Sequence, residues 1–282
     1  MFVETIEALS TGIGVIEVSE KVFPTFKKVF RKITKGDLTI AIFGAGGTGK
    51  STLGKTLSGT LEIGGFLQKY NESIFEEKYK LDSNIIGSVI VAPGQKRRED
   101  SWGDLLRLLS KGKIKLVINV VSYGYHSFGE FSYTQHRLFK DGMNVEEFME
   151  EYAKDCRQRE LEVLEKITPH LSITNQKKTI LITLITKQDL WWNERLNVKD
   201  YYENGEYSQL IKKIQDKLGS ANFVHEYRST SLVIQNLLSG TGELLIPTTA
   251  GYDQILQVAN LNFFFNAIET LFNISLKNIK GG

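Results

Sequence analysis

Short apolar runs alternate with longer amphipathic stretches along most of this chain. Each apolar run is a continuous block and does not alternate residue by residue with polar positions. Continuous runs of this length predict strands that are buried on both faces, as in a parallel sheet covered by helices. On this basis strands are predicted at residues 38–43, 85–91, 114–121 and 179–185.

Apolar residues at helical spacing lie between these runs. They predict helices at residues 51–57, 102–110, 145–167, 201–218 and 254–272. A weaker strand candidate at 76–81 precedes the 85–91 run closely enough to pair with it in the antiparallel direction. Alternating strands and helices are typical of α/β proteins. We therefore expect a three-layer α/β domain with a mostly parallel sheet and one antiparallel edge strand.

Residues 13–35 carry apolar side chains at three- and four-residue spacings, with basic residues between them. This pattern predicts an amphipathic helix ahead of the first strand. The helix packs on the domain's own sheet, or it contacts a partner helix or an anionic membrane surface, and the sequence leaves these alternatives open. We divide the chain into an N-terminal helical extension, 1–36, and a main domain, 37–282.

A glycine-rich segment links the first predicted strand directly to the first predicted helix. From Gly44 to Ser51 it matches the phosphate-loop pattern G-x-x-x-x-G-K-[S/T] in full. Glycines allow positive φ angles that turn main-chain N–H groups inward, and the helix dipole adds partial positive charge there. We expect Lys50 to reach the β- and γ-phosphates of a nucleotide and the Ser51 hydroxyl to coordinate Mg²⁺. The residues expected to form this P-loop site are Gly44, Gly46, Gly47, Thr48, Gly49, Lys50, Ser51 and Thr52.

The segment Thr186-Lys187-Gln188-Asp189 follows the predicted strand 179–185. It resembles the [N/T]-K-x-D guanine-specificity motif of the Ras-like (TRAFAC-class) P-loop GTPase superfamily. Together with the P-loop it carries a resemblance that spans residues 38–272, without assigning a subfamily. The resemblance implies that Asp189 accepts two hydrogen bonds from guanine and that the Lys187 stem lies along the base. Thr186 stands where asparagine is commoner.

The family's last motif has a looser match at residues 229–232. The resemblance implies that Ser231 and Leu232 lie at the base, where a main-chain N–H meets the guanine oxygen. We expect the chain to bind GTP or GDP through these residues and the P-loop.

The switch segments match the family less well. The family has D-x-x-G at the end of its third strand, often followed by glutamine, and the aligned residues here run from Val91 to Gln95. The resemblance implies that Gly94 donates its N–H to the γ-phosphate and that Gln95 orients the attacking water. Val91 stands where an aspartate would hold magnesium through water. Another acid would then be needed, and Glu99 and Asp100 are the nearest candidates downstream.

A hydroxyl from the first switch is also expected at the metal. Ser73 is the candidate because it precedes the predicted strand 76–81, as the family's threonine does, and a solvated loop serine is the alternative. The basic run 96–98 follows Gln95 directly. It is a candidate for neutralising transition-state charge in cis, or it forms a solvated face.

Aromatic side chains mark two further segments. Residues 122–144 are longer than a minimal GTPase has at this point, and their first part, 123–128, is rich in aromatic residues. We interpret them as an insertion in a GTPase-like domain. With Trp191 and Trp192 they are candidates for contact with a protein partner, as are the switches and the N-terminal helix, and core packing explains the aromatic residues equally well.

Composition narrows the partners and the compartment. Lys and Arg number 35 against 33 Asp and Glu, and the net charge of +2 gives no global positive field for nucleic acid. The single Cys156 cannot form an internal disulfide, and the N-terminus lacks the basic-then-apolar pattern of a signal peptide. We therefore expect a cytoplasmic protein. Any membrane contact would be peripheral, because no apolar run reaches the roughly 20 residues of a membrane span.

These patterns favour a guanine-nucleotide-binding molecular switch that slowly hydrolyses GTP to GDP and phosphate, with Mg²⁺ as its metal and Lys50 and Gln95 as catalytic residues. Two alternatives stay open. The chain is a non-catalytic nucleotide-binding assembly module, as Val91 suggests, or it is an ATPase of another P-loop class in which the 186–189 match is accidental.

Overall fold

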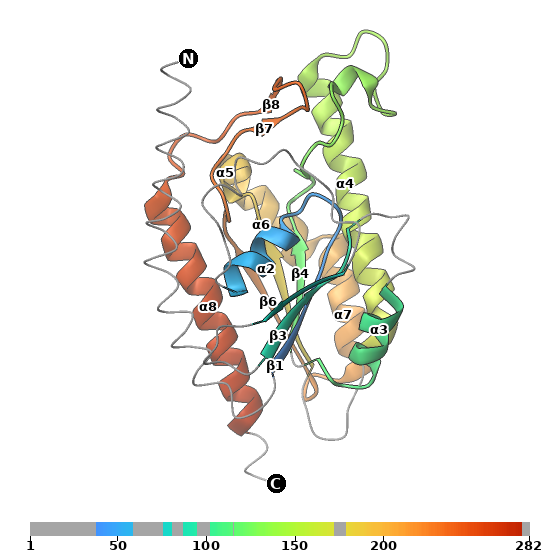
Figure 1. Cartoon of the computed structure of the whole chain (residues 1–282), viewed down its shortest axis with the longest axis vertical. Helices are drawn as coiled ribbons and strands as arrows, with labels where there is room; N and C mark the ends of the chain where they lie inside the picture. Colours follow the sequence, from blue (N-terminus) through green and yellow to red (C-terminus); the bar gives the residue numbers. More distant parts are fainter. Residues whose placement is uncertain are drawn as a thin grey trace.

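The computed structural model describes residues 38–58, 76–80, 87–94, 102–114, 116–171 and 179–277. Within them a six-stranded sheet has the order β2-β3-β1-β4-β5-β6, with helices on both faces (Figure 1). Strand β2 pairs antiparallel with β3, and every other pair of neighbours in this sheet is parallel. The mostly parallel sheet with one antiparallel edge strand is thus confirmed. Its strands are β1 (Leu38–Phe43), β2 (Glu77–Lys80), β3 (Gly87–Val91), β4 (Leu116–Val121), β5 (Thr179–Ile185) and β6 (Phe223–Ser229).

The helices follow the predicted pattern with one exception. The predicted helix 201–218 is wrong, because two helices meet at Gly205, where an added Cβ would lie 2.6 Å from the main-chain oxygen of Tyr201. The longer helices are α2 (Lys50–Ser58), α3 (Gly103–Ser110), α4 (Val145–Ile167), α6 (Arg195–Asn204), α7 (Glu206–Leu218) and α8 (Gln254–Lys277). Short turns are α5 (Gln188–Trp191), η3 (Tyr133–Gln135), η4 (Thr168–His170) and η5 (Trp192–Glu194), and a small hairpin pairs β7 (Leu237–Leu238) with β8 (Leu244–Ile246).

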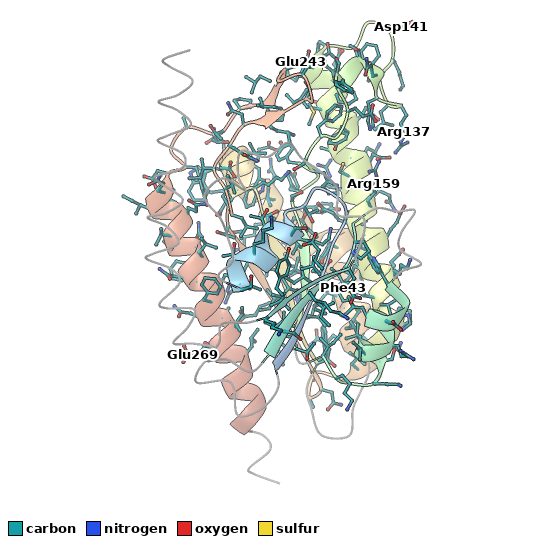
Figure 2. All side chains as sticks on the ribbon, in the orientation of Figure 1. Phe43, Arg137, Asp141, Arg159, Glu243 and Glu269 are labelled. Carbon is teal, nitrogen blue, oxygen red and sulfur yellow. The ribbon has the colours of Figure 1, made fainter. Side chains whose placement is uncertain are left out.

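Each face of the sheet has its own apolar core. On one face, alternate residues of β1, β3, β4 and β5 pack against α2 and α8. On the other face, the remaining residues of those strands pack against α3, α4, α6 and α7. Phe43 lies at the centre of the molecule, edge-on to Trp102 at 5.3 Å, while the charged residues labelled in Figure 2 lie toward the periphery. Continuous burial on both faces explains why the strands are apolar without alternation.

Residues 122–144 pack on the first half of α4 and on the β7–β8 hairpin. The aromatic rings of Phe128, Phe148 and Tyr152 form a third apolar cluster there, separate from the two faces of the sheet. A capping box between Asn144 and Glu147 starts α4. Most aromatic residues of this segment therefore pack within the chain, and Phe131, which is 64% exposed, is the clear exception.

Several predicted features lie outside the described residues. They are the helix at 13–35, Ser73, Gln95, the basic run 96–98, Glu99 and Asp100. Among the helices of the described ranges, none combines the length and the apolar character needed to cross a membrane.

Candidate functional site: the P-loop and the loop after β5

The P-loop forms a cradle between β1 and the N-terminus of α2. Gly44, Gly47 and Gly49 have φ angles of 146°, 77° and 94°. A Cβ at Gly44 would lie 2.3 Å from the Val120 oxygen, and one at Gly47 would lie 2.6 Å from the Ser127 nitrogen. Since side chains would both strain and fill this turn, the loop fits the close backbone approach that a phosphate requires.

Gly46 does not have a positive φ angle, unlike the other three glycines of the loop. Its role is spatial instead. A Cβ built on Gly94 would lie 2.7 Å from the Gly46 Cα and 2.5 Å from the Lys50 Nζ. Gly94, after the end of β3, therefore comes directly against the P-loop and the lysine head, where the resemblance to GTPases implied a γ-phosphate contact.

Lys50 is held inside the loop that precedes it. Its Nζ donates a hydrogen bond to the main-chain oxygen of Ala45 at 2.7 Å, and the side chain is only 5% exposed. The Thr48 hydroxyl donates to the same oxygen at 3.0 Å. The ammonium group is thus held against the main chain of the P-loop.

Two side-chain oxygen atoms lie close together at the start of α2, and magnesium prefers oxygen ligands. The Ser51 hydroxyl donates a hydrogen bond to Oε1 of Glu77 at 3.0 Å. Glu77 lies on β2 directly opposite Val91 of β3. Val91 itself is fully buried and offers no oxygen, so among the described residues Ser51 and Glu77 are the pair that fits a hard cation at this position.

The loop after β5 is tied to the P-loop by hydrogen bonds. The Thr186 hydroxyl donates to the main-chain oxygens of Thr48, at 2.7 Å, and Val121, at 3.0 Å. Lys187 adopts the left-handed conformation with φ of 56°, which is rare for a residue with a side chain and is a mark of constrained functional loops. Its Nζ donates to Ser127 Oγ at 3.0 Å, and desolvation lowers the pKa of Lys187 to about 8 although Asp189 partly offsets this.

Asp189 is 1% exposed and turns its carboxylate into the same loop. Oδ1 accepts a short hydrogen bond from the Ser231 hydroxyl, and Oδ2 accepts one from the Gln235 main-chain N–H at 3.0 Å. Burial raises the pKa of Asp189 to about 6, against these hydrogen bonds. Because an ionised carboxylate has about four acceptor positions, two acceptor positions are left for a base.

The loop after β6 lies against both the P-loop and the loop after β5. The main-chain N–H of Ser231 donates to the Tyr252 hydroxyl at 3.1 Å, so it is already engaged within the chain. A Cβ at Gly49 would lie 3.4 Å from Cδ1 of Leu232, which places Leu232 against the P-loop. One pocket is lined jointly by the P-loop, the loop after β5 and this segment, and its residues include Thr48, Gly49, Thr52, Lys187, Asp189 and Leu232.

The loop after β4 is the fourth part of the candidate site. The buried residues that hold this loop in place were not predicted from the sequence. Glu160 of α4 is fully buried and accepts hydrogen bonds from the main-chain N–H groups of Ser122 (2.8 Å) and Gly124 (3.2 Å). It is also 3.0 Å from His126 Nε2 and accepts from the Tyr202 hydroxyl at 2.6 Å. Burial lowers the pKa of His126, but Cys156 and Glu160 more than offset it, and the pKa rises to about 9.

This buried cluster fixes Ser127 at the P-loop, where its N–H donates to the Gly47 oxygen at 3.0 Å. The signal in the sequence was an acid in an apolar stripe, since Glu160 stands four residues after the buried Cys156 and four before the buried Leu164 on α4. The Glu77 contact had no such signal, because it depends on the register between β2 and β3.

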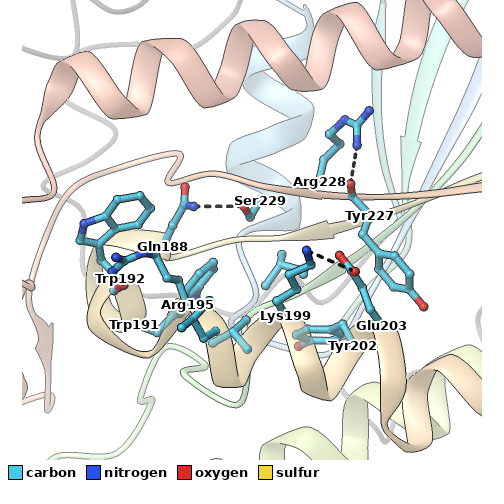
Figure 3. A pocket seen from close by; sticks show the side chains of 13 residues that line it. Gln188, Trp191, Trp192, Arg195, Lys199, Tyr202, Glu203, Tyr227, Arg228 and Ser229 are labelled. Atoms are coloured by element: carbon cyan, nitrogen blue, oxygen red, sulfur yellow. Dashed lines mark hydrogen bonds and ion pairs between the residues drawn. The ribbon is translucent and has the colours of Figure 1, made fainter.

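A second pocket, of about 290 Å³, lies behind the loop after β5 and is lined by α5, α6 and β6 (Figure 3). The Gln188 amide crosses it to the Ser229 hydroxyl at 3.0 Å. Trp191 is 2% exposed, and its indole N–H donates a hydrogen bond to the main-chain oxygen of Thr186 at 2.8 Å. Trp191 therefore supports the loop after β5 from inside the core. Trp192 is half-buried, under the Arg195 guanidinium at 5.0 Å.

The strand order, the antiparallel β2 and the P-loop between β1 and α2 define a three-layer α/β fold of the P-loop NTPase class. No protein-family model matches the chain, and no curated protein matches it in sequence. Solved structures similar to it include the Arl6 BBS3 small GTPase from Trypanosoma brucei, with 11% identity and a TM-score of 0.40 over 83% of this chain and 98% of that one.

Two other similar structures are a dimerization-deficient mutant of Toc33 from Arabidopsis thaliana and the GTPase-like domain of S. cerevisiae Ski7 bound to GDP and inorganic phosphate. The first has 14% identity and a TM-score of 0.43 over 92% of this chain and 95% of that one. The second has 15% identity and a TM-score of 0.41 over 84% and 51%. At these scores the likenesses carry no conclusion about activity, and function rests on the geometry of the site.

Proposed function

We propose that this chain binds guanine nucleotides as a molecular switch and hydrolyses GTP slowly. The observation that carries the proposal is the meeting of two loops far apart in sequence. Thr186 bonds to Thr48 at 2.7 Å, and a single pocket is lined by Gly49 on one side and by Lys187 and Asp189 on the other. A phosphate cradle next to a buried carboxylate is the arrangement that a nucleotide with a hydrogen-bond-donating base edge requires.

Each described residue of the site has a role in this proposal. The P-loop N–H groups and Lys50 bind the phosphates, and Gly94 contacts the terminal one. Asp189 accepts hydrogen bonds from the guanine ring nitrogen and amino group, while the Lys187 stem lies along the base and the Leu232 N–H meets the guanine oxygen. Mg²⁺, when bound beside Ser51, would neutralise phosphate charge. A cytoplasmic location, where the buried Cys156 stays reduced, belongs to the same proposal.

A second candidate is a nucleotide-binding assembly module without turnover. The specific observation in its favour is Val91, a fully buried aliphatic residue where the GTPases have their metal-holding aspartate. The third reading, an ATPase, would make the Asp189 carboxylate unfavourable, because the adenine edge presents an acceptor where guanine presents a donor.

Two measurements on the purified full chain separate these candidates. Nucleotide released by denaturing protein purified without added ligand is identified by chromatography, and we expect GDP or GTP. Phosphate release is then followed with GTP and Mg²⁺. Slow turnover supports the switch, bound guanine nucleotide without turnover supports the assembly module, and bound ADP or ATP contradicts the guanine assignment.

A further inference from the structure

The end of β3 cannot supply an acid to a metal. Val91 is 0% exposed, and its Cγ2 lies 2.8 Å from where a Cβ on Gly54 of α2 would be. Its side chain therefore packs between the sheet and α2, within the apolar core. Val91 therefore supplies no carboxylate to a magnesium ion beside Ser51, the serine that follows the lysine.

Glu77 places a carboxylate at that serine from the neighbouring strand. The antiparallel register sets Glu77 opposite Val91. Oε1 of Glu77 accepts the hydrogen bond of the Ser51 hydroxyl at 3.0 Å. The carboxylate thus comes from one strand further out in the sheet than the end of β3, and it lies next to the hydroxyl proposed to bind the metal.

The spacing of these two oxygens matches a magnesium shell. Magnesium prefers octahedral geometry with oxygen ligands at about 2.0–2.1 Å, so two neighbouring ligands lie about 2.9 Å apart. The observed 3.0 Å between Ser51 Oγ and Glu77 Oε1 needs almost no adjustment. On metal binding the Ser51 hydroxyl would turn a lone pair to the cation and release its hydrogen bond to Glu77.

A second contact fixes the direction of the carboxylate. The Tyr79 hydroxyl donates a short hydrogen bond to Oε2 of Glu77, the carboxylate oxygen that does not accept from Ser51. The Tyr79 ring is itself wedged on α2, since a Cβ at Gly54 would lie 2.7 Å from its Cε2. One oxygen is thereby held by Tyr79 and the other faces Ser51.

We propose that Glu77 is a direct magnesium ligand, paired with Ser51, and that it replaces the acid missing at Val91. The inference rests on the proposed nucleotide binding, because phosphate oxygens and water complete the shell. The ligand class is a small hard divalent cation.

The test is the Mg²⁺ dependence of GDP release from the full-length chain, followed with a fluorescent GDP analogue. Mg²⁺ should slow release from the wild type. Glu77→Gln should need at least about tenfold more Mg²⁺ for half of this effect. Glu76→Gln is the matched control, since Glu76 is the adjacent acid and pairs with Lys78 at 3.2 Å. Titration of GDP-loaded protein with Mn²⁺, read by electron paramagnetic resonance, should show the same loss for Glu77→Gln only.

Tyr79→Phe should shift the Mg²⁺ dependence in the same direction by a smaller factor, because the carboxylate loses its fixed orientation. If Glu77→Gln does not fold, Glu77→Asp retracts the carboxylate by one methylene and should show the shift. An unchanged Mg²⁺ midpoint in a folded Glu77 variant that binds GDP normally overturns the inference and leaves the proposed function standing. A wild type that binds no GDP overturns the proposed function and this inference with it.

Discussion

The hydroxyl of Thr186 reaches across to the main-chain oxygen of Thr48, at 2.7 Å, and joins the loop after β5 to the P-loop. Both residues are almost fully buried, so this hydrogen bond is not exchanged with water. This hydrogen bond therefore holds the loop after β5 against the P-loop, and with it the proposed base site next to the proposed phosphate site. A substitution should therefore remove base specificity without phosphate affinity, or the reverse, only when the changed side chain faces the ligand.

Lys50→Ala should abolish tight nucleotide binding while the fold is retained. Removing one partner of a desolvated charge pair costs about 2 kcal/mol or more, which is about 30-fold or more in affinity. Titration calorimetry with GDP measures the loss. Lys55→Ala, on the same helix but outside the cradle, is the control and should bind GDP as the wild type does. Wild-type affinity in Lys50→Ala would remove the phosphate role of the P-loop.

The affinity for GDP should fall as the pH falls through about 6. Burial raises the pKa of Asp189 to about 6, and the protonated carboxyl no longer accepts two hydrogen bonds. At pH 5 about one molecule in ten is ionised, so affinity should be about tenfold weaker than at pH 7. The same raised pKa makes this group favour the folded state as the pH falls from 6 to 4, so binding and stability should change in opposite directions.

Asp189→Asn is the control for that pH dependence, because the phosphates of GDP titrate in the same range. The ratio of wild-type to variant affinity cancels the titration of the ligand. A ratio that stays constant between pH 5 and 7 would show that Asp189 is ionised throughout or does not contact the base.

Glu160→Gln should lower the free energy of unfolding by about 3 kcal/mol at neutral pH, since it leaves the buried His126 cation without its partner. Cys156 and Glu160 together raise the pKa of His126 to about 9, so the part of this stabilisation that comes from the His126 charge is complete below about pH 6.5 and is lost as the pH rises through 9. The difference between wild type and variant should shrink accordingly. Urea denaturation at pH 6.5 and 9.5 measures it, with the exposed Glu165→Gln on the same helix as control. An equal difference at both pH values would contradict the assignment.

Val91→Asp should destabilise the chain and should not improve magnesium binding. The side chain is fully buried against α2, and an unpaired carboxylate there costs several kcal/mol. The melting temperature should fall from wild type to Val91→Thr and further to Val91→Asp. A folded Val91→Asp with the wild-type melting temperature and a lower Mg²⁺ requirement would show that this strand end does face the metal.

The parts of the site that depend on local chain geometry could be predicted from the sequence. The P-loop is one continuous segment whose glycines and lysine stand at fixed spacings, and Thr186 to Asp189 follow a strand that apolar residues mark clearly. Four strands and their parallel pairing followed from unbroken apolar runs. The missing aspartate at Val91 was also visible.

The parts that depend on contacts between distant segments could not be predicted. Glu77 meets Ser51 only because β2 pairs with β3 in one register, and a shift by one residue would turn its side chain to the other face. Glu160 supports the loop after β4 from α4, although it lies 34 residues after His126 in the sequence. The break between α6 and α7 was missed because apolar residues stand on both sides of Gly205, at Tyr202 and Tyr207, whereas Gly205 itself leaves the helical conformation, with φ of −84° and ψ of −160°.

The most direct test of the central claim is titration of GDP, ADP and xanthosine diphosphate into nucleotide-free wild type and Asp189→Asn in the presence of Mg²⁺. The wild type should bind GDP and bind ADP at least about 100-fold more weakly. Asp189→Asn should lose about tenfold or more in GDP affinity, since a charge-assisted hydrogen bond contributes about 1.5–3 kcal/mol, and should gain affinity for xanthosine diphosphate. Equal binding of GDP and ADP by the wild type, or unchanged GDP affinity in a folded Asp189→Asn, would contradict the account.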